Sequence, residues 1–158
     1  MTRMMFGASV LALSLTLLPM THAQAPAPAM EAFETGQWGA AESAASSATS
    51  DVDALILASE AALMPITLDQ AEGMSRRDRR EAALRAQEYA EAALALEPDN
   101  AEAHLRLAAG LGYQSRYVNK LRAVMMGLPQ QGRDHMIEAI RLDPSEPWGP
   151  AMLGAWHL

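Results

Sequence analysis

The spacing of apolar and polar residues predicts a series of helices whose buried faces consist mostly of small side chains. From Ser75 to Leu96, apolar residues recur at the i, i+3, i+4 spacing of a helix with one buried face, at Ala83, Ala86, Ala90, Ala93 and Leu94. Ser75 followed three residues later by Asp78 is a helix-start signal. Pro98 is expected to end this helix and Asn100 to cap the next, which has one face made of His104, Leu107, Ala108 and Leu111.

The same criteria predict helices on both sides of this pair. Gly36 separates a short first turn from a helix that carries Trp38, and a helix over residues 52–64 is expected to end at Pro65. A connecting segment with partial helix is expected over about 113–130. A helix should follow over 131–142 and end at Asp143-Pro144, and a last helix should begin near Trp148 or Pro150 and run to the end.

Two stretches of the chain repeat one pattern. Ala93 precedes Pro98 by five residues and Ala139 precedes Pro144 by five; Leu107-Ala108 and Leu153-Gly154 follow their prolines by nine and ten. This pattern resembles the tetratricopeptide repeat, in which a small residue, a helix-ending proline and a Leu-Gly or Leu-Ala pair recur. Residues Gly36, Trp38 and Ala41 are similar to that family's entry into a second helix.

The repeat is longer than the family period of about 34 residues. The prolines at 98 and 144 are 46 residues apart, and the alanines at 48 and 93 are 45 apart. About a dozen residues are therefore expected as insertions between the helices of each pair, at 65–75 and roughly 114–130.

A narrower resemblance covers about residues 100–158. Ala139-Ile140-Arg141-Leu142-Asp143-Pro144, followed by Leu153-Gly154-Ala155-Trp156, is similar to the turn and helix of the regulator of microtubule dynamics family and its bacterial relatives. The resemblance implies long, stacked helix pairs. Microtubule binding is not expected to be inherited, because the chain is acidic and begins with an export-like segment.

These patterns predict an all-α fold, a tetratricopeptide-like α-α superhelix of stacked antiparallel helix pairs over residues 30–158. Such a superhelix presents a concave face, built from the first helix of each pair, to peptides or partner helices. Ala93 and Ala139 are expected to be buried at equivalent helix crossings. The last helix has no polar cap, so the domain is expected to be truncated at its C-terminal end, or covered there by a partner or a second copy.

The N-terminus has the order of a secretory signal. Arg3 precedes an uncharged, mostly apolar run over residues 4–20, and Thr21-His22-Ala23 offers a cleavage site before Gln24, with a second before Pro26. A membrane anchor is the alternative. We expect a signal peptide over residues 1–23, a Pro/Ala linker over 24–29, and a periplasmic location.

Composition narrows the function. The net charge is −7, with 19 acidic residues against 12 basic ones, so no nucleic-acid partner is expected. Cysteine is absent, which excludes disulfides, thiolate zinc sites and a cysteine nucleophile. No cofactor is expected, because no phosphate-binding loop or nucleophile elbow occurs.

One cluster of side chains could carry binding, namely Tyr113, Arg116, Tyr117 and Lys120. Tyr117 and Lys120 are three residues apart, so a single helical turn would bring them together. A tyrosine and lysine pair also occurs in short-chain dehydrogenases, but there it follows a glycine-rich loop that is missing here. We therefore expect partner or ligand contacts at this cluster, and no catalysis.

The histidines and the basic run have two interpretations each. His104 lies where the repeat has a groove-facing residue, although a half-buried packing role is the alternative; no histidine pair has metal-ligand spacing, so no metal is expected. The run Ser75-Arg76-Arg77-Asp78-Arg79-Arg80 is interpreted as solvated surface, with docking to anionic lipid or an acidic partner as the alternative.

The chain is thus expected to be an exported protein-interaction scaffold or adaptor and not an enzyme. The alternative is an accessory subunit or small-ligand binder that uses residues 113–120. Self-association through the C-terminal helix is a further possibility.

Overall fold

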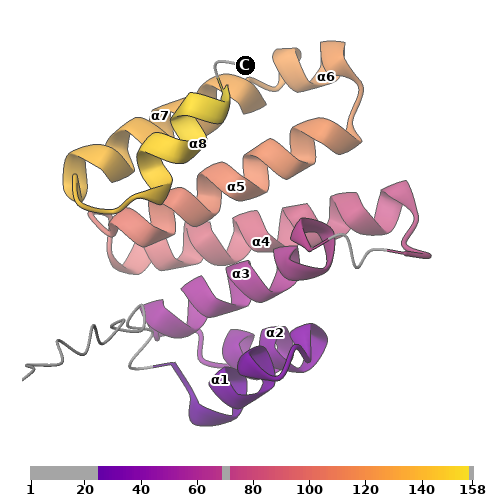
Figure 1. Cartoon of the computed structure of the whole chain (residues 1–158), viewed down its shortest axis with the longest axis vertical. Coiled ribbons are helices and arrows are strands. Elements are labelled where there is room, and N and C mark those ends of the chain that lie inside the picture. The colour runs from indigo at the N-terminus through magenta and orange to yellow at the C-terminus, as the bar shows by residue number, and fades with distance from the viewer. Residues whose placement is uncertain (1–24, 69–71, 157–158) are drawn as a thin grey trace, which may run out of the picture.

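The described part of the chain is entirely helical and consists of stacked, antiparallel helices (Figure 1). A computed structural model describes residues 25–68 and 72–156. Within them the elements are α1 (Ala27–Glu34), α2 (Trp38–Ser46), α3 (Val52–Thr67), α4 (Arg76–Leu96), α5 (Ala101–Tyr117), α6 (Lys120–Met125), α7 (Leu128–Leu142) and α8 (Trp148–Trp156). The predicted all-α class is confirmed, and each helix packs on its neighbour in sequence.

The predicted helix starts are confirmed in atomic detail. The Ser75 hydroxyl accepts from the Asp78 amide at 3.1 Å, and the Asp78 carboxylate accepts from the Ser75 amide at 3.0 Å. Hydrogen bonding from Ser75 holds the pKa of the Asp78 carboxyl below its usual value. Asn100 caps α5 by accepting from the Ala103 amide at 3.0 Å. Gly36, at a φ of 74°, makes the turn between α1 and α2.

Two predictions based on proline were wrong. The linker expected over 24–29 gives way to α1 at Ala27, because Pro28 stands in the first turn, where a helix needs no amide donor. Pro65 does not end α3, which runs on to Thr67. The turn after Pro65 stays hydrogen-bonded: the Leu68 amide donates to the Met64 carbonyl at 3.0 Å, and the Thr67 hydroxyl donates to the Leu63 carbonyl at 3.0 Å.

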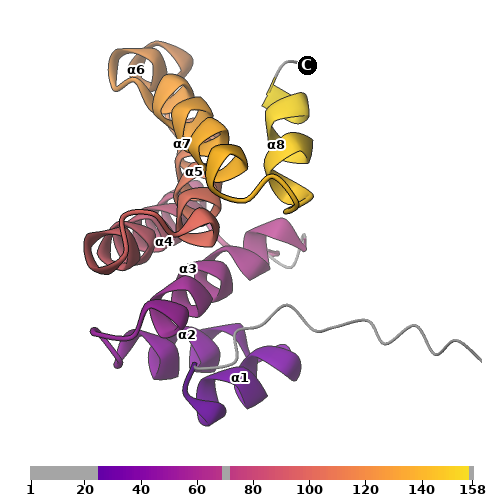
Figure 2. The same ribbon diagram turned by 90° about the vertical axis from the view of Figure 1, so that its left-hand side faces the viewer.

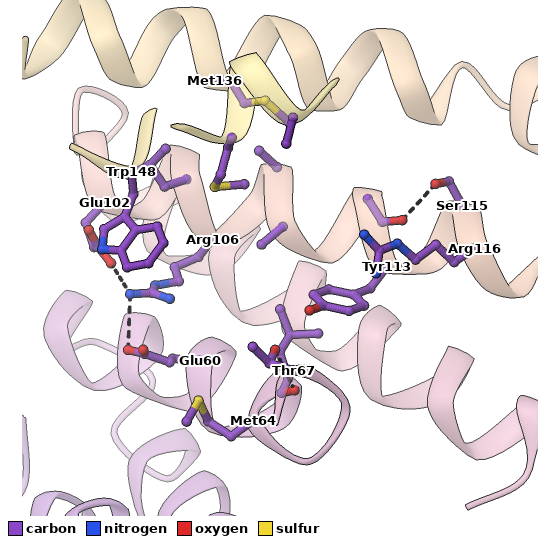
Figure 3. Close-up of a pocket in the computed structure, with 17 residues that line it drawn as sticks. Glu60, Met64, Thr67, Glu102, Arg106, Tyr113, Ser115, Arg116, Met136 and Trp148 are labelled. Atoms are coloured by element: carbon purple, nitrogen blue, oxygen red, sulfur yellow. Dashed lines mark hydrogen bonds and ion pairs between the residues drawn. The ribbon is translucent and has the colours of Figure 1, made fainter. Parts of the chain in front are cut away.

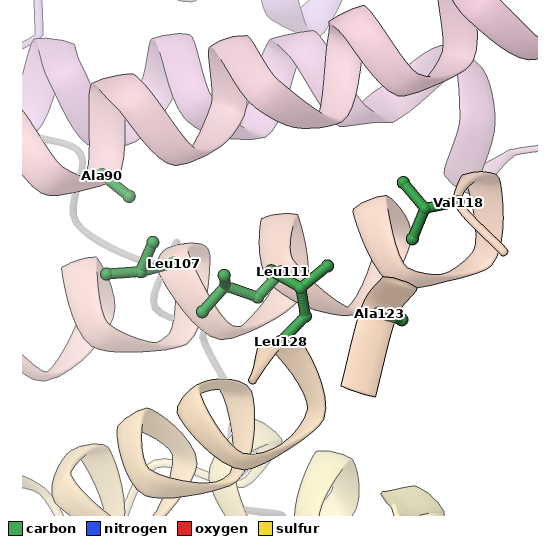
Figure 4. Close-up of a cluster of buried hydrophobic side chains, with 6 residues drawn as sticks. All are labelled: Ala90, Leu107, Leu111, Val118, Ala123 and Leu128. Atoms are coloured by element: carbon green, nitrogen blue, oxygen red, sulfur yellow. The ribbon is translucent and has the colours of Figure 1, made fainter. Parts of the chain in front are cut away.

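The connection expected over 113–130 is mostly helix. Helix α5 continues to Tyr117, and α6 follows after Asn119, whose side chain accepts from the Arg122 amide at 2.7 Å. Gly127, at a φ of 69°, turns the chain into α7. Buried side chains join these helices in one cluster, which is Ala90, Leu107, Leu111, Val118, Ala123 and Leu128 (Figure 4). This burial explains why the segment is ordered as helix.

Small residues let the central helices approach closely. Helix α4 lies between α3 and α5, and the alanines on its buried face at 83, 86, 90 and 93 have no exposed surface. Ala139 on α7 is also buried, so the expected burial of both alanines is confirmed. At Gly110, a methyl group would come within 2.8 Å of the Gln87 side chain, so α5 needs glycine at its contact with α4.

Two polar side chains inside this core have hydrogen-bond partners. The Ser59 hydroxyl on α3 donates to the Ala86 carbonyl of α4 at 2.8 Å. The Gln87 amide on α4 donates to the Gly110 carbonyl and to the Gln114 side chain of α5, both at 3.2 Å. Because buried polar groups are costly when unpaired, these bonds stabilise the α3–α4–α5 stack.

The signal peptide expected over residues 1–23 and the end of the chain at 157–158 lie outside the described residues. Among the helices that the structure describes, none is both long and apolar enough to cross a bilayer.

Candidate binding groove

An apolar groove of about 750 Å³ runs along α5 and is bounded by α3 and α8 (Figure 3). Figure 2 shows how these three helices are arranged. Helix α5 packs on both α3 and α7, and α8 packs on α7. Three residues of α8 line the groove, namely Trp148, Met152 and Ala155. Apolar side chains make up most of the wall, including Leu63, Met64, Leu105, Ala109, Met136 and Met152.

One end of the groove carries excess negative charge. Arg106 on α5 forms ion pairs with Glu60 of α3, at 3.1 Å, and with Glu102 of its own helix. Two carboxylates thus surround one guanidinium. The indole of Trp148, which is 57% exposed, lies beside this triad (Figure 3). The exposed ring offers an apolar contact at the acidic end.

The opposite end carries positive charge. The guanidinium of Arg116 lies 5.0 Å from the centre of the Tyr113 ring, which is within the range of a cation–π contact. Tyr113 is half-buried and lines the groove, and Arg116 is exposed at its rim. The tyrosine ring therefore orients the arginine at the mouth of the groove.

A second cavity, which we call the arginine recess, adjoins this end. It encloses about 370 Å³ and is lined by Met74, Arg76, Arg79, Arg116 and Tyr117, so Arg116 lines both cavities. Arg76 at the start of α4 donates to the Tyr117, Arg116 and Val118 carbonyls at 3.1, 3.3 and 3.4 Å. It thereby caps the end of α5 and brings the two helix ends together.

The arginine run is therefore more than the solvated surface expected from the sequence. Arg77 fits that expectation, since it is exposed and pairs with Glu81 at 2.8 Å. Arg76 instead binds the end of α5, and Arg79 donates to the Met74 carbonyl at 3.2 Å. The signal for this role was indirect: the last carbonyls of α5 need donors, but only the fold shows which arginine supplies them.

The four residues of the predicted cluster are distributed over different surfaces. Tyr113 and Arg116 lie on the groove, and Tyr117 lies in the recess. Lys120 is exposed at the start of α6, beyond the extended backbone of Val118. The expectation that one helical turn joins Tyr117 and Lys120 is wrong, because α5 ends between them.

His104 is buried away from the groove and contacts a second histidine, which the sequence did not predict. Its Nδ1 lies 2.8 Å from Nδ1 of His135 on α7, and its Nε2 lies 3.0 Å from the Pro98 carbonyl. Because a carbonyl only accepts, His104 Nε2–H donates to it. In the neutral pair, His135 Nδ1–H then donates to His104.

This histidine pair joins α5 to α7, and the environment of His135 disfavours protonation of its ring. Burial lowers the pKa of His135, as does the charge of His104, while Asp134 and Glu138 act in the opposite direction. Within the described residues, no group of three or more histidine, aspartate or glutamate side chains could hold a metal ion. The pair is a packing contact between residues 31 apart, a separation that sequence spacing does not reveal.

A family profile matches the chain from α2 to its end. The description is regulator of microtubule dynamics protein 1-3, and the match covers residues 38–158. The chain belongs to this family. The sequence resemblance, placed at 100–158, is thus confirmed and extends over most of the helical stack. No curated protein matches the chain.

Proposed function

We propose that this protein is a non-catalytic scaffold or adaptor that receives an apolar segment of a partner protein in the groove. The observation that carries the proposal is the enclosure of one apolar surface by helices α3, α5 and α8. Such a surface suits an amphipathic helix laid into a groove. Glu102 and Arg116 are 14 residues apart on α5, which is about 21 Å, enough for roughly four turns of a bound helix.

The repeat pattern supports this use of the groove. The long-insertion tetratricopeptide interpretation assigns α3, α5 and α8 to the concave, ligand-facing side of a superhelix. The family takes its name from the regulation of microtubule dynamics. We do not extend that activity to this chain, since its export-like N-terminus favours a periplasmic location, which N-terminal sequencing of protein made in a Gram-negative host would test.

The groove also supports a second candidate, the binding of a small ligand. Its volume of about 750 Å³ lies within the range of about 300–1,000 Å³ common for small-molecule sites, and Tyr113 and Arg116 lie at its mouth. A further part of the proposal is self-association through α8, whose Trp148 is exposed. Light scattering at increasing concentration would detect it.

The test of the main proposal is selection of peptides from a displayed library of random 16-residue sequences. Protein produced from the full sequence should select peptides with apolar residues at i, i+3, i+4 and i+7. Gly112→Trp should abolish their binding, because Gly112 lines the groove and has open space at its Cβ position. Gly39→Trp, at an equally open glycine on α2, is the matched control and should bind normally. Failure to select any peptide that Gly112→Trp excludes would contradict the proposal.

A further inference from the structure

The groove and the arginine recess adjoin at Arg116, and the two ends of this surface differ in charge. Arg116 lines both cavities, so an occupant of the groove that extends past Tyr113 reaches Arg116 at the edge of the recess. At the other end, Glu60 and Glu102 outnumber Arg106. The positive end stands out because the chain as a whole carries a net charge of −7.

Two arginines that line the recess, Arg76 and Arg116, keep their positive charge for a ligand. The hydrogen bonds from Arg76 run to three backbone carbonyls, which are neutral and leave its charge in place. Within the described residues, neither Arg76 nor Arg116 forms an ion pair with a carboxylate; Glu81 pairs with Arg77 instead. Arg116 stacks on Tyr113 and keeps its donors at the rim.

We propose that the recess binds carboxylates at one end of the partner's apolar helix, so that the partner segment is apolar along one face and acidic at a single end. Guanidinium groups bind carboxylates through paired, charge-assisted hydrogen bonds, and Arg116 stands at the junction where such a group would arrive. The inference rests on the proposed function of the groove and specifies the chemistry of its occupant.

The two charged ends favour a peptide over a fatty acid or other anionic lipid. A single anionic head group would satisfy the recess, but an alkyl chain offers nothing to the acidic triad at Glu60, Glu102 and Arg106. A helix about 21 Å long can place a different side chain at each end. An acidic peptide segment thus uses the full length of the groove.

The experiment repeats the peptide selection with Arg116→Gln and, as a control, Arg122→Gln, an exposed arginine of α6 that lines neither cavity. The normal chain and Arg122→Gln should select peptides that combine the apolar spacing with Asp or Glu at one end. Arg116→Gln should select the apolar spacing without the acidic end. Circular dichroism of each variant verifies that the helical fold is retained.

A double-mutant cycle then measures the contact directly. A peptide selected by the normal chain should lose roughly 10-fold in affinity when its acidic residue is changed to the amide, or when Arg116 is changed to Gln, in line with a charge-assisted hydrogen bond. The two changes together should cost little more than either alone, because they remove the same interaction.

The outcomes separate the inference from the function on which it rests. Selection of apolar peptides with no acidic preference, or an acidic preference that survives Arg116→Gln, overturns the inference and leaves the groove as a peptide site. Selection of no peptide overturns both. Binding of dodecanoate but not dodecanol, in the absence of any selected peptide, would assign the surface to an anionic lipid.

Discussion

The two copies of the Ala-to-Pro turn have nearly the same backbone but different surroundings. In the first, the Glu97 amide donates to the Ala93 carbonyl at 2.9 Å, with φ and ψ of −131° and 87° at Glu97. In the second, the Asp143 amide donates to the Ala139 carbonyl at 2.9 Å, with −133° and 91° at Asp143. The local sequence is therefore sufficient to build the turn twice.

The helices that follow the two turns differ in length and burial. Helix α5 has 17 residues and packs on α3, α4 and α7, so Leu107 is only 5% exposed. Helix α8 has 9 residues and packs on α7, and the equivalent Leu153 is half-buried. The comparison shows that a repeated sequence fixes local geometry, while burial depends on which neighbours exist.

The largest effect is expected from enlarging the alanine that begins each turn. Ala93→Leu should lower the free energy of unfolding by about 3 kcal/mol, because Ala93 is sealed among Leu55, Ile56 and Ala103. Ala139→Leu, outside the central α3–α4–α5 stack, should cost less, about 1–2 kcal/mol. Urea denaturation measures both. Equal losses would mean that the two crossings are equally enclosed, and no loss in either would refute the assignment of equivalent positions.

The next effect is expected at the glycines of α5. Gly110→Ala should destabilise by about 1–2 kcal/mol, since the new methyl group meets Gln87 at 2.8 Å and this outweighs the gain in helix propensity. Gly112→Ala, two residues later with open space, is the matched control and should be neutral or stabilising by up to about 1 kcal/mol. If both substitutions stabilise, α4 and α5 are not in such close contact.

A smaller, pH-dependent effect is expected from the histidine pair that ties α7 to α5. Because the pKa of His135 is lowered in the folded state, the unfolded chain binds the proton more readily. Stability should therefore be complete above pH 6.5, the usual pKa of histidine, and fall as the pH drops below it.

Thermal melts between pH 7.5 and 5 would measure this loss. His135→Asn keeps an N–H donor for His104 but does not titrate, so the loss in this range should shrink. The carboxyl groups with lowered pKa, those of Asp78, Glu138 and Asp143, titrate at lower pH than His135. An unchanged pH profile in His135→Asn would show that another group is responsible.

The smallest effect is expected at Gly154, the counterpart of the fully buried Ala108. Gly154 is exposed with open space at its Cβ position, so Gly154→Ala should raise the free energy of unfolding by up to about 1 kcal/mol through helix propensity alone. Denaturation of the dilute protein measures this gain. A marked loss of stability would show that α8 is packed as closely as α5.

The sequence predicted what local chemistry determines. The caps at Ser75 and Asn100, the turn at Gly36 and the burial of Ala93 were all read from neighbouring residues. Prolines were misjudged because their effect depends on position within a helix: Pro28 stands in a first turn and Pro65 in a last one.

The groove and recess were only partly predictable. Tyr113 and Arg116 are one helical turn apart on α5, so their proximity follows from spacing. The contacts of Arg76 with the end of α5, about 40 residues away, and of His104 with His135 depend on how helices pair in space. The acidic end likewise needs Glu60 of α3 beside Arg106 of α5.

The buried amide of Gln87 has a consequence for the groove, although it lies outside it. Apolar faces rich in alanine could slide past one another with little penalty, but a slip by one turn, about 5.4 Å, would break the hydrogen bonds from the Gln87 amide to Gly110 and Gln114 of α5. The hydrogen bonds from Gln87 thus fix the register of α4 against α5. Because Arg76 and Arg79 lie on α4 and Arg116 lies on α5, the same hydrogen bonds set the distances between these three arginines.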